Sequence, residues 1–456
     1  MGKGQIFVCQ QCGRESVKWL GHCPDCEGWN TFVETLRTPV SRSRTAHTFN
    51  TPLELSQTPT EEAPRIAVDM EEFNRVLGGG IVPGSLVLIG GDPGIGKSTL
   101  LLQVSAMVAQ GGGKVLYIAG EESPGQIRLR AKRLGVDGDR LFILSETNLE
   151  MIVEHLSQTS PDIVIIDSIQ TTYLDELGGA PGSVGQIREC TMRLMQWAKP
   201  SNVPVLLSGH VTKDGAIAGP RVLEHVVDVV LHLEGESFSA YRLLRGVKNR
   251  FGSTNEVGIF EMREQGLVEV SNPSEVFLAE RGGETVGSAV VPTLEGTRPL
   301  LVEIQALTTN TSYGPPRRIS NGIDFNRLLM IAAVLTKRAG LALGNQDIIV
   351  NVAGGLKVNE PAADLGVALA IASSLRNVAV DPDLAAIGEL GLSGELRSVP
   401  HLERRLNEAA KLGFKRCLLP MVKKVDAPQG MELLVAASIR EALRLALPKS
   451  KKPEAE

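Results

Sequence analysis

The chain has 456 residues and a formal net charge of -5, with 43% hydrophobic and 22% charged residues. This length predicts two or three domains, and the ordinary composition excludes a wholly disordered chain. With a net negative charge, any nucleic-acid partner would have to meet locally clustered basic residues. No apolar run approaches the roughly 18 residues of a membrane span, and the N-terminus lacks the apolar stretch of a signal peptide. We therefore expect a cytoplasmic protein with no membrane partner.

Four of the six cysteines form two Cys-x-x-Cys pairs near the N-terminus: Cys9, Cys12, Cys23 and Cys26. Two such pairs can supply the four thiolates of a tetrahedral zinc site. A redox pair or unrelated cysteines are the alternatives, and neither explains two pairs. We expect residues 1–33 to form a C4 zinc finger with a structural Zn²⁺, because this segment is too small to fold on an apolar core alone. The remaining cysteines, Cys190 and Cys417, are expected to be buried as small hydrophobes.

The next segments differ sharply in composition. Residues 34–64 are rich in Ser, Thr and Pro without apolar periodicity, which predicts a linker. Between residues 65 and 272, short apolar, β-branched runs alternate with helical stretches. Five of these runs are predicted to be buried parallel strands: 85–90, 114–120, 140–145, 162–167 and 203–209. The alternation predicts a doubly wound α/β sheet.

The first of these strands leads into a phosphate-binding loop, since the sequence fits G-x-x-x-x-G-K-[ST] at Gly91, Asp92, Pro93, Gly94, Ile95, Gly96, Lys97 and Ser98. Glycines let backbone N–H groups wrap phosphates, and the following helix N-terminus favours negative charge. We expect Lys97 to reach the β- and γ-phosphates of ATP, Ser98 to ligate Mg²⁺, and Thr99 to lie near the α-phosphate. A chance Gly-rich turn is the alternative, and the strand–loop–helix order argues against it.

Acidic residues and a histidine lie at the carboxyl ends of three of the other predicted strands. Asp167 ends an apolar strand in the Walker B pattern and is expected to hold the Mg²⁺ shell through water. Glu121 and Glu122 follow another strand, where a carboxylate could orient or deprotonate the attacking water. Two surface glutamates that start a helix are the alternative, and the sequence does not choose between the pair. His210 ends a later strand, either as a γ-phosphate sensor or as a structural histidine.

These motifs occur together in one known family. The C4 cysteine module, the GDPGIGKST loop at 91–99 and the pentapeptide KNRFG at 248–252 resemble, in this order, bacterial RadA (Sms) DNA repair proteins. The resemblance implies a RecA-like ATPase core that assembles into a homo-hexameric ring with ATP between subunits. Lys248 and Arg250 would then stabilise charge on the γ-phosphoryl group in the neighbouring subunit. The alternative for the pentapeptide is a solvated β-turn that closes a hairpin.

Two loops are candidates for DNA contacts. One spans Gly178–Ser183 after the Walker B strand, and the other begins at Thr212. In RecA-like rings the corresponding loops line the central channel, and Lys213 and Arg221 suit sequence-independent binding of phosphates. The alternative is that these loops are flexible and bind nothing. No aromatic stacking platform is evident, which weakens the case for base-specific recognition.

A second αβ section follows a short predicted linker at 273–283. Residues 284–448 resemble the proteolytic domain of Lon, whose fold is like ribosomal protein S5 domain 2, and 449–456 form a charged tail. The resemblance rests on three stretches: Gly354–Leu356, Pro361–Gly366 and Gly388–Leu396.

The catalytic residues of Lon are not retained in this section. Lon proteases use a serine activated by a lysine, and here Asp364 stands in the place of the serine. No lysine occurs between Lys357 and Lys411. An arginine nearby, Arg404 or Arg405, cannot serve as the base because it stays protonated. We expect this domain to support ring assembly rather than proteolysis, with arginines available for DNA: Arg317, Arg318, Arg327, Arg404 and Arg405.

The resemblance implies a DNA-stimulated ATPase or helicase that acts on single-stranded and branched DNA. It would promote branch migration of strand-invasion structures made by the RecA recombinase, with ATP, Mg²⁺ and structural Zn²⁺ as cofactors. An ATP-gated DNA-binding scaffold without translocation is the main alternative. An autokinase related to the circadian RecA-family proteins would share the core, but not the zinc module or the KNRFG pentapeptide.

Overall fold

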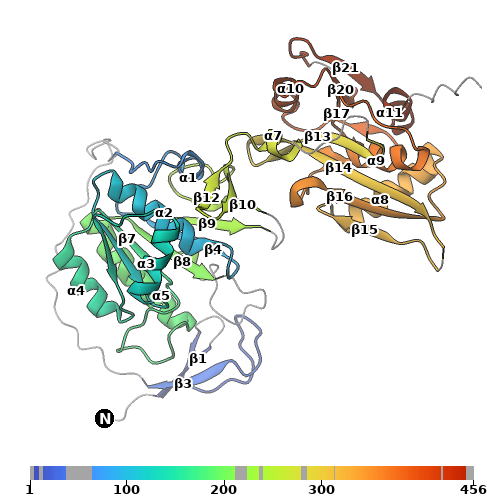
Figure 1. Ribbon diagram of the computed structural model, residues 1–456. Helices are drawn as coiled ribbons and strands as arrows, with labels where there is room; N and C mark the ends of the chain where they lie inside the picture. Colours follow the sequence, from blue (N-terminus) through green and yellow to red (C-terminus); the bar gives the residue numbers. More distant parts are fainter. Residues whose placement is uncertain are drawn as a thin grey trace, which may run out of the picture. The chain divides into compact units, whose positions relative to one another are not determined.

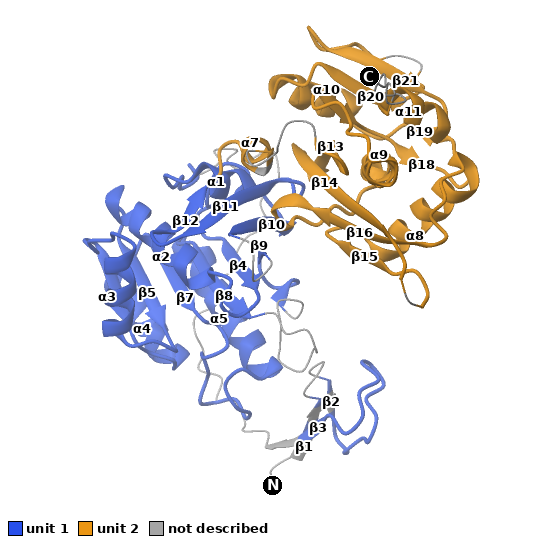
Figure 2. Cartoon of the chain, turned by 45° about the vertical axis from the view of Figure 1, so that its right-hand side comes forward, with its two compact units in different colours: residues 1–269 blue, residues 270–456 orange. Residues whose placement is uncertain are grey.

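The computed structural model describes residues 5–9, 14–36, 64–210, 223–235, 240–278, 285–312, 314–422 and 425–447. The chain divides into two compact units, residues 1–269 and residues 270–456 (Figure 2). Within the described ranges, no helix has both the length and the apolar character needed to cross a membrane.

The N-terminal module is a small antiparallel sheet with strand order β2-β1-β3. Its strands are β1 (Gln5–Cys9), β2 (Glu15–Ser16) and β3 (Phe32–Leu36). The buried core of the module consists of Cys9, Cys23 and Phe32. So few apolar side chains cannot offset the conformational entropy of folding, which agrees with a module held together by metal.

The first unit also contains a nine-stranded sheet with the order β12-β11-β10-β9-β4-β8-β7-β5-β6. The strands from β9 to β6 in this order are parallel to one another, which confirms the predicted doubly wound sheet. All five predicted strands are present: β4 (Leu86–Gly91), β5 (Val115–Ala119), β6 (Leu141–Leu144), β7 (Ile163–Asp167) and β8 (Val205–His210).

Helices cover both faces of this sheet (Figure 1). They are α1 (Glu71–Leu77), α2 (Lys97–Gln110), α3 (Pro124–Arg133), α4 (Leu149–Thr159) and α5 (Val184–Ser201). Alternate residues of one strand enter opposite cores: Val87 and Ile89 pack with α1, α2 and α3, whereas Leu86 and Leu88 pack with α4 and α5. Burial on both faces explains the continuous apolar runs of β4, β5, β7 and β8, whereas the prediction of burial was wrong for β6, an edge strand that is only partly buried.

An antiparallel extension continues the sheet beyond its parallel part. It comprises β9 (Val229–Glu234), β10 (Tyr241–Asn249), β11 (Val257–Arg263) and β12 (Gly266–Glu269). Strand β9 pairs parallel with β4 on one side and antiparallel with β10 on the other. Residues 250–256 connect β10 to β11, so Lys248 and Asn249 of the KNRFG pentapeptide end β10, and Arg250, Phe251 and Gly252 begin this connection.

The second unit contains a seven-stranded mixed sheet with the order β15-β16-β14-β13-β17-β20-β21. Its strands are β13 (Ser288–Glu295), β14 (Arg298–Asn310), β15 (Arg318–Asn321), β16 (Gln346–Val352), β17 (Leu384–Ala386), β20 (Arg416–Pro420) and β21 (Glu432–Ala436). A separate pair is formed by β18 (Glu389–Leu390) and β19 (Leu396–Arg397).

The helices of this unit are α7 (Pro273–Leu278), α8 (Phe325–Val334), α9 (Asp364–Arg376), α10 (Leu402–Lys411) and α11 (Ile439–Ala446). Short irregular helical turns occur at Leu335–Ala339, Ala353–Gly355 and Pro361–Ala363. The structure differs from the predicted linker at 273–283, because α7 is helical and packs on β14. Ser274 accepts a hydrogen bond from the backbone N–H of Leu301 at 3.1 Å and donates one to Glu408 at 2.9 Å.

Candidate nucleotide site

The candidate residues converge at one edge of the sheet of the first unit. Parallel pairing places Gly91 opposite His210 and Ala119 opposite Asp167. The P-loop, the segment after β5, the Walker B aspartate and His210 therefore lie along the carboxyl ends of neighbouring strands. In doubly wound sheets this edge is where ligands bind.

Close packing explains two of the three glycines of the P-loop, Gly91 and Gly96. Gly96 has φ +117°, and a Cβ there would lie 2.6 Å from the Met262 side chain. A Cβ on Gly91 would lie 2.5 Å from the carbonyl oxygen of Leu233 in β9. The loop thus sits directly against the antiparallel extension while Asp92, Pro93 and Gly94 stay exposed. Its exposed backbone, followed by the N-terminus of α2, suits a polyphosphate.

Lys97 is the buried cation of this loop, with only 4% of its surface exposed. Its Nζ donates to the carbonyl oxygens of Gly91 at 2.8 Å and Asp92 at 3.0 Å, and lies 3.1 Å from His210 Nδ1. Burial lowers the pKa of Lys97, and the charge of Asp167 opposes this effect. Burial and the neighbouring Lys97 likewise lower the pKa of His210, which favours a neutral imidazole.

The structure distinguishes Glu121 from Glu122, a choice that the sequence left open. Glu121 Oε1 accepts a hydrogen bond from the Ser168 hydroxyl at 2.7 Å and lies 3.9 Å from His210 Nε2. Glu122 instead forms an ion pair with Arg130 of α3. Glu121 is therefore joined to the Walker B segment and to His210, whereas Glu122 is engaged by a helix on the α2 side of the sheet.

Sequence reasoning missed three residues around the P-loop and Asp167. Ser168 holds Glu121, and Tyr117 donates its hydroxyl to Asp167 Oδ2 at 2.6 Å. Burial, followed by the charge of Asp167, raises the pKa of Tyr117 well above its usual range. Arg242 in β10 donates from Nε to the carbonyl oxygen of Ile95 in the P-loop at 3.2 Å. The signal for Tyr117 was a hydroxyl within an otherwise aliphatic strand, whereas Arg242 lies in a strand with several charged residues and had no such signal.

The donor set fits Mg²⁺-bound ATP. The Ser98 hydroxyl and the Asp167 carboxylate are hard oxygen ligands of the kind that Mg²⁺ prefers. Ser98 and Thr99 lie in the first turn of α2, both partly accessible. These residues would hold the metal and the nucleotide beside Lys97.

The KNRFG pentapeptide lies away from the P-loop of its own chain. Gly91 of the P-loop is opposite Leu233 in β9, whereas Asn249 is opposite Val229 at the other end of that strand. Four residues separate these positions, which is about 13 Å of strand. Lys248 and Arg250 therefore lie at the amino ends of the central parallel strands, and the P-loop at their carboxyl ends.

Backbone and acidic groups hold the cations of the pentapeptide. Lys248 Nζ donates to the carbonyl oxygens of Glu224 and Val227, the latter at 2.8 Å. Burial, followed by the charge of Arg250, lowers the pKa of Lys248. Arg250 Nη1 lies 3.5 Å from the buried carboxylate of Asp228, and the Arg250 side chain is 54% exposed. The Arg250 side chain therefore reaches the surface while the buried carboxylate of Asp228 holds it in place.

Three predicted zinc ligands come together in the N-terminal module. The Sγ atoms of Cys9, Cys23 and Cys26 all lie within 4.8 Å of one another, and those of Cys9 and Cys26 are 3.6 Å apart. Zn–S bonds of about 2.3 Å in a tetrahedron place sulfur atoms roughly 3.8 Å apart, so the cluster fits zinc. Cys12 lies outside the described residues, as do the predicted DNA contacts Lys213 and Arg221.

The other two cysteines are fully buried, as expected. Burial raises the pKa of the Cys190 thiol to about 11 and also raises that of Cys417. Neither thiol is a reactive thiolate at neutral pH.

Three of the arginines expected to contact DNA are engaged within the second unit, Arg327 and Arg405 in ion pairs and Arg318 in hydrogen bonds to the carbonyl oxygens of Leu343 and Gln346. Arg405 is 1% exposed and forms an ion pair with Glu360 at 2.6 Å, so the expectation of a DNA contact was wrong for this residue. Arg327 forms a bidentate ion pair with Asp364, the residue expected in the place of the Lon serine. Arg327 compensates the buried carboxylate of Asp364, whereas the buried guanidinium of Arg405 is compensated by Glu360, whose side chain is 23% exposed.

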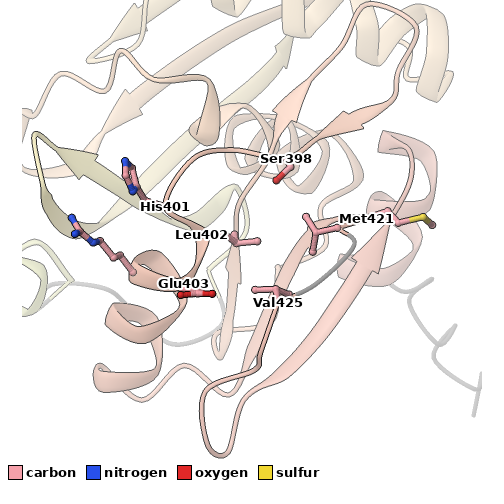
Figure 3. A pocket seen from close by; sticks show the side chains of 8 residues that line it. Ser398, His401, Leu402, Glu403, Met421 and Val425 are labelled. Carbon is pink, nitrogen blue, oxygen red and sulfur yellow. The ribbon is translucent and has the colours of Figure 1, made fainter.

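Arg404, by contrast, lines a surface pocket of about 700 Å³ in the second unit. The other lining residues come from the segment between β19 and α10, from the start of α10 and from the segment after β20 (Figure 3): Ser398, His401, Leu402, Glu403, Met421, Val422 and Val425. All residues that line this pocket belong to the second unit, and none of them is a predicted nucleotide-binding residue.

Three segments match known family models. Residues 7–34 match a rubredoxin metal binding domain, residues 50–216 an AAA domain, and residues 324–423 the ChlI subunit of Mg-chelatase. Fold, P-loop geometry and these matches define a P-loop ATPase with a RecA-like core, preceded by a zinc ribbon and followed by a Lon-like domain.

The chain is also similar along nearly its whole length to curated relatives. It is 54% identical over 450 residues to DNA repair protein RadA of Bacillus subtilis, covering 97% of this chain and 98% of that protein. It is 55% identical over 450 residues to DNA repair protein RadA of Listeria monocytogenes, with the same shares covered. The chain belongs to the RadA family of DNA repair proteins.

Proposed function

We propose that this chain is a DNA-dependent ATPase and helicase that hydrolyses ATP between neighbouring subunits of a hexameric ring. It acts in the cytoplasm on single-stranded and branched DNA, and it promotes branch migration of strand-invasion structures made by the RecA recombinase. The names of its relatives support the role in DNA repair. The substrate, the ring and the partner are our inference from family resemblance.

The main observation in support of a ring is that the P-loop and the KNRFG pentapeptide of one chain lie far apart. Lys248 and Arg250 lie at the opposite end of β9 from Gly91. If these cations stabilise charge on a transferring phosphoryl group, the nucleotide must belong to another subunit. A head-to-tail interface between copies brings the two ends together, and such interfaces close into rings.

Within one nucleotide site, different residues of the chain have different roles in ATP binding and hydrolysis. Lys97 exchanges its carbonyl partners for the β- and γ-phosphates, and Ser98 and Asp167 hold Mg²⁺, which neutralises phosphate charge when bound. Glu121 orients the attacking water and accepts its proton. His210, neutral and 3.1 Å from Lys97 Nζ, senses the γ-phosphate. Lys248 and Arg250 of the neighbour stabilise the transition state.

The loop Gly178–Ser183 is our proposed DNA contact within the described residues. Its residues are exposed or partly exposed, and it connects the Walker B strand to α5. We assign no peptidase activity to the second unit, because its Asp364 is neutralised by Arg327 and offers no nucleophilic hydroxyl. We propose that this unit supports assembly of the ring.

The test is ATP hydrolysis with and without single-stranded and forked DNA, in the native chain, Lys97→Ala and Lys248→Ala. DNA should stimulate the native chain, and both variants should be inactive. An equal mixture of the two variants should recover about one quarter of the native rate, since random assembly pairs an intact P-loop with an intact Lys248 at that frequency. No recovery on mixing would contradict action in trans.

A second arm separates a motor from an ATP-gated scaffold. Branch migration of a labelled DNA junction should require ATP and fail in Lys97→Ala. If DNA stimulates ATP hydrolysis but the junction does not migrate, the ATP-gated scaffold becomes the better explanation. If DNA does not stimulate ATP hydrolysis, the motor and the scaffold both lose their main support.

A further inference from the structure

A tyrosine lies beneath the proposed magnesium site, on the strand next to the Walker B strand. Tyr117 is the central residue of β5 and is 1% exposed. Its hydroxyl donates a hydrogen bond to Asp167 Oδ2 at 2.6 Å. This length is typical of a hydrogen bond from a hydroxyl to a carboxylate.

Strand register explains how the two groups meet. Tyr117 is opposite Ile165 in β7, and Ala119 is opposite Asp167, so the pair is a diagonal one across neighbouring strands. Side chains two residues apart share a face of the sheet. Tyr117 and Ile165 both pack in the core against α1, α2 and α3, and Asp167 therefore shares the face that carries α2 and the P-loop lysine.

Filling the core does not require a hydroxyl at this position. The other residues of β5 are aliphatic, namely Val115, Leu116, Ile118 and Ala119, and phenylalanine would occupy the same space as the tyrosine ring. A buried hydroxyl without a partner is unfavourable, so its presence here depends on Asp167. The phenol is always a donor toward a carboxylate, so one lone pair of Oδ2 is engaged by Tyr117 while Oδ1 keeps both of its lone pairs available to water.

We propose that Tyr117 is a positioning residue for the Walker B aspartate. Its hydroxyl fixes the rotation of the Asp167 carboxylate, so that a single oxygen is presented to the water shell of Mg²⁺. Partners of this kind orient ligands throughout metal sites, and their loss weakens metal affinity or activity about 10-fold or more. The proposal rests on the role of Asp167 given above as a residue of the magnesium shell.

The experiment measures Mg²⁺-dependent binding of a fluorescent ADP analogue to the full-length chain. In Tyr117→Phe the Mg²⁺ concentration at half-maximal binding should rise about 10-fold, while binding in EDTA stays unchanged. Tyr241→Phe is the matched control, because it removes a hydroxyl from β10 and should leave the Mg²⁺ dependence unchanged. Thermal unfolding of each variant tests whether the fold is retained.

Two further variants make the outcomes distinguishable. Asp167→Ala should weaken Mg²⁺-dependent binding more than Tyr117→Phe does. The double variant should bind Mg²⁺ within about 2-fold of Asp167→Ala, because a residue that acts through Asp167 adds nothing once it is gone. An unchanged Mg²⁺ dependence in Tyr117→Phe, with a strong effect in Asp167→Ala, overturns the role of Tyr117 alone. No effect in Asp167→Ala overturns the proposed magnesium role of Asp167 itself.

Discussion

Replacing Glu121 by glutamine tests which acid activates the attacking water. Glu121 is 52% exposed, is held by the Ser168 hydroxyl and lies 3.9 Å from His210, so it can contact both water and the site. General bases contribute 10²- to 10⁴-fold. We therefore expect kcat of Glu121→Gln to fall by about that factor, which is roughly 3–5 kcal/mol of transition-state stabilisation. Nucleotide affinity should change by less than about 2-fold, because the amide keeps the shape of the side chain.

Glu122→Gln is the matched control, one residue away. Glu122 is 34% exposed and pairs with Arg130, which is 18% exposed. Pairs of this partly exposed kind contribute at most about 1 kcal/mol to stability. The control should therefore lose a little stability, while its kcat stays within about 3-fold of native.

The assay is steady-state hydrolysis in the presence of DNA, combined with direct measurement of nucleotide binding and thermal unfolding. The reasoning is refuted if Glu122→Gln loses as much kcat as Glu121→Gln. It is also refuted if Glu121→Gln loses nucleotide affinity rather than kcat, since the residue would then bind rather than catalyse.

Four other outcomes are expected. Glu360→Gln leaves the buried guanidinium of Arg405, which is 1% exposed, without an opposite charge and should destabilise the second unit by about 3–5 kcal/mol in chemical unfolding; a loss under about 1 kcal/mol would show that the pair is dispensable. Cys23→Ser should lower bound zinc, measured by elemental analysis, and make the N-terminal module sensitive to protease; retention of one zinc per chain would exclude Cys23 as a ligand. The lowered pKa of His210 means that its contribution to stability is complete above its unfolded pKa, about 6.5, and is lost as the pH falls through the folded pKa. Native chain should therefore lose more stability than His210→Gln on acidification from pH 7, and equal losses would contradict this. Arg242→Gln removes a hydrogen bond to the P-loop and should raise the KM for ATP several-fold with little change in kcat, whereas an unchanged KM would assign Arg242 a structural role alone.

The P-loop, the Walker B strand and the paired cysteines could be identified from sequence because each is contiguous or regularly spaced. The P-loop binds through successive backbone groups, so its glycines and Lys97 must be neighbours in the chain. Parallel strands buried on both faces must be apolar throughout, so β4, β5 and β7 were also evident. Local rules of this kind fixed the fold class and the edge of the sheet where the site lies.

Contacts between distant segments decided the rest. Lys248 illustrates this, because strict alternation would place it on the same face as Leu244, which packs with α1 and α2. A shift in register between Gly246 and Lys248 places Lys248 opposite Val230 instead, on the face that packs with α4 and α5. A one-residue bulge reverses the face of every later side chain. The periodicity of the strand does not reveal such a bulge.

The same limit applies to the choice between Glu121 and Glu122 and to the burial of Arg405. The sequence specified which charged groups exist, and it left open which partner each would meet. Partners such as Arg130, Ser168 and Glu360 lie far along the chain or on other elements. A charge in low-dielectric surroundings depends on whatever compensates it in space. Tertiary structure alone therefore decided which carboxylate faces the nucleotide site and which arginine lies in the core.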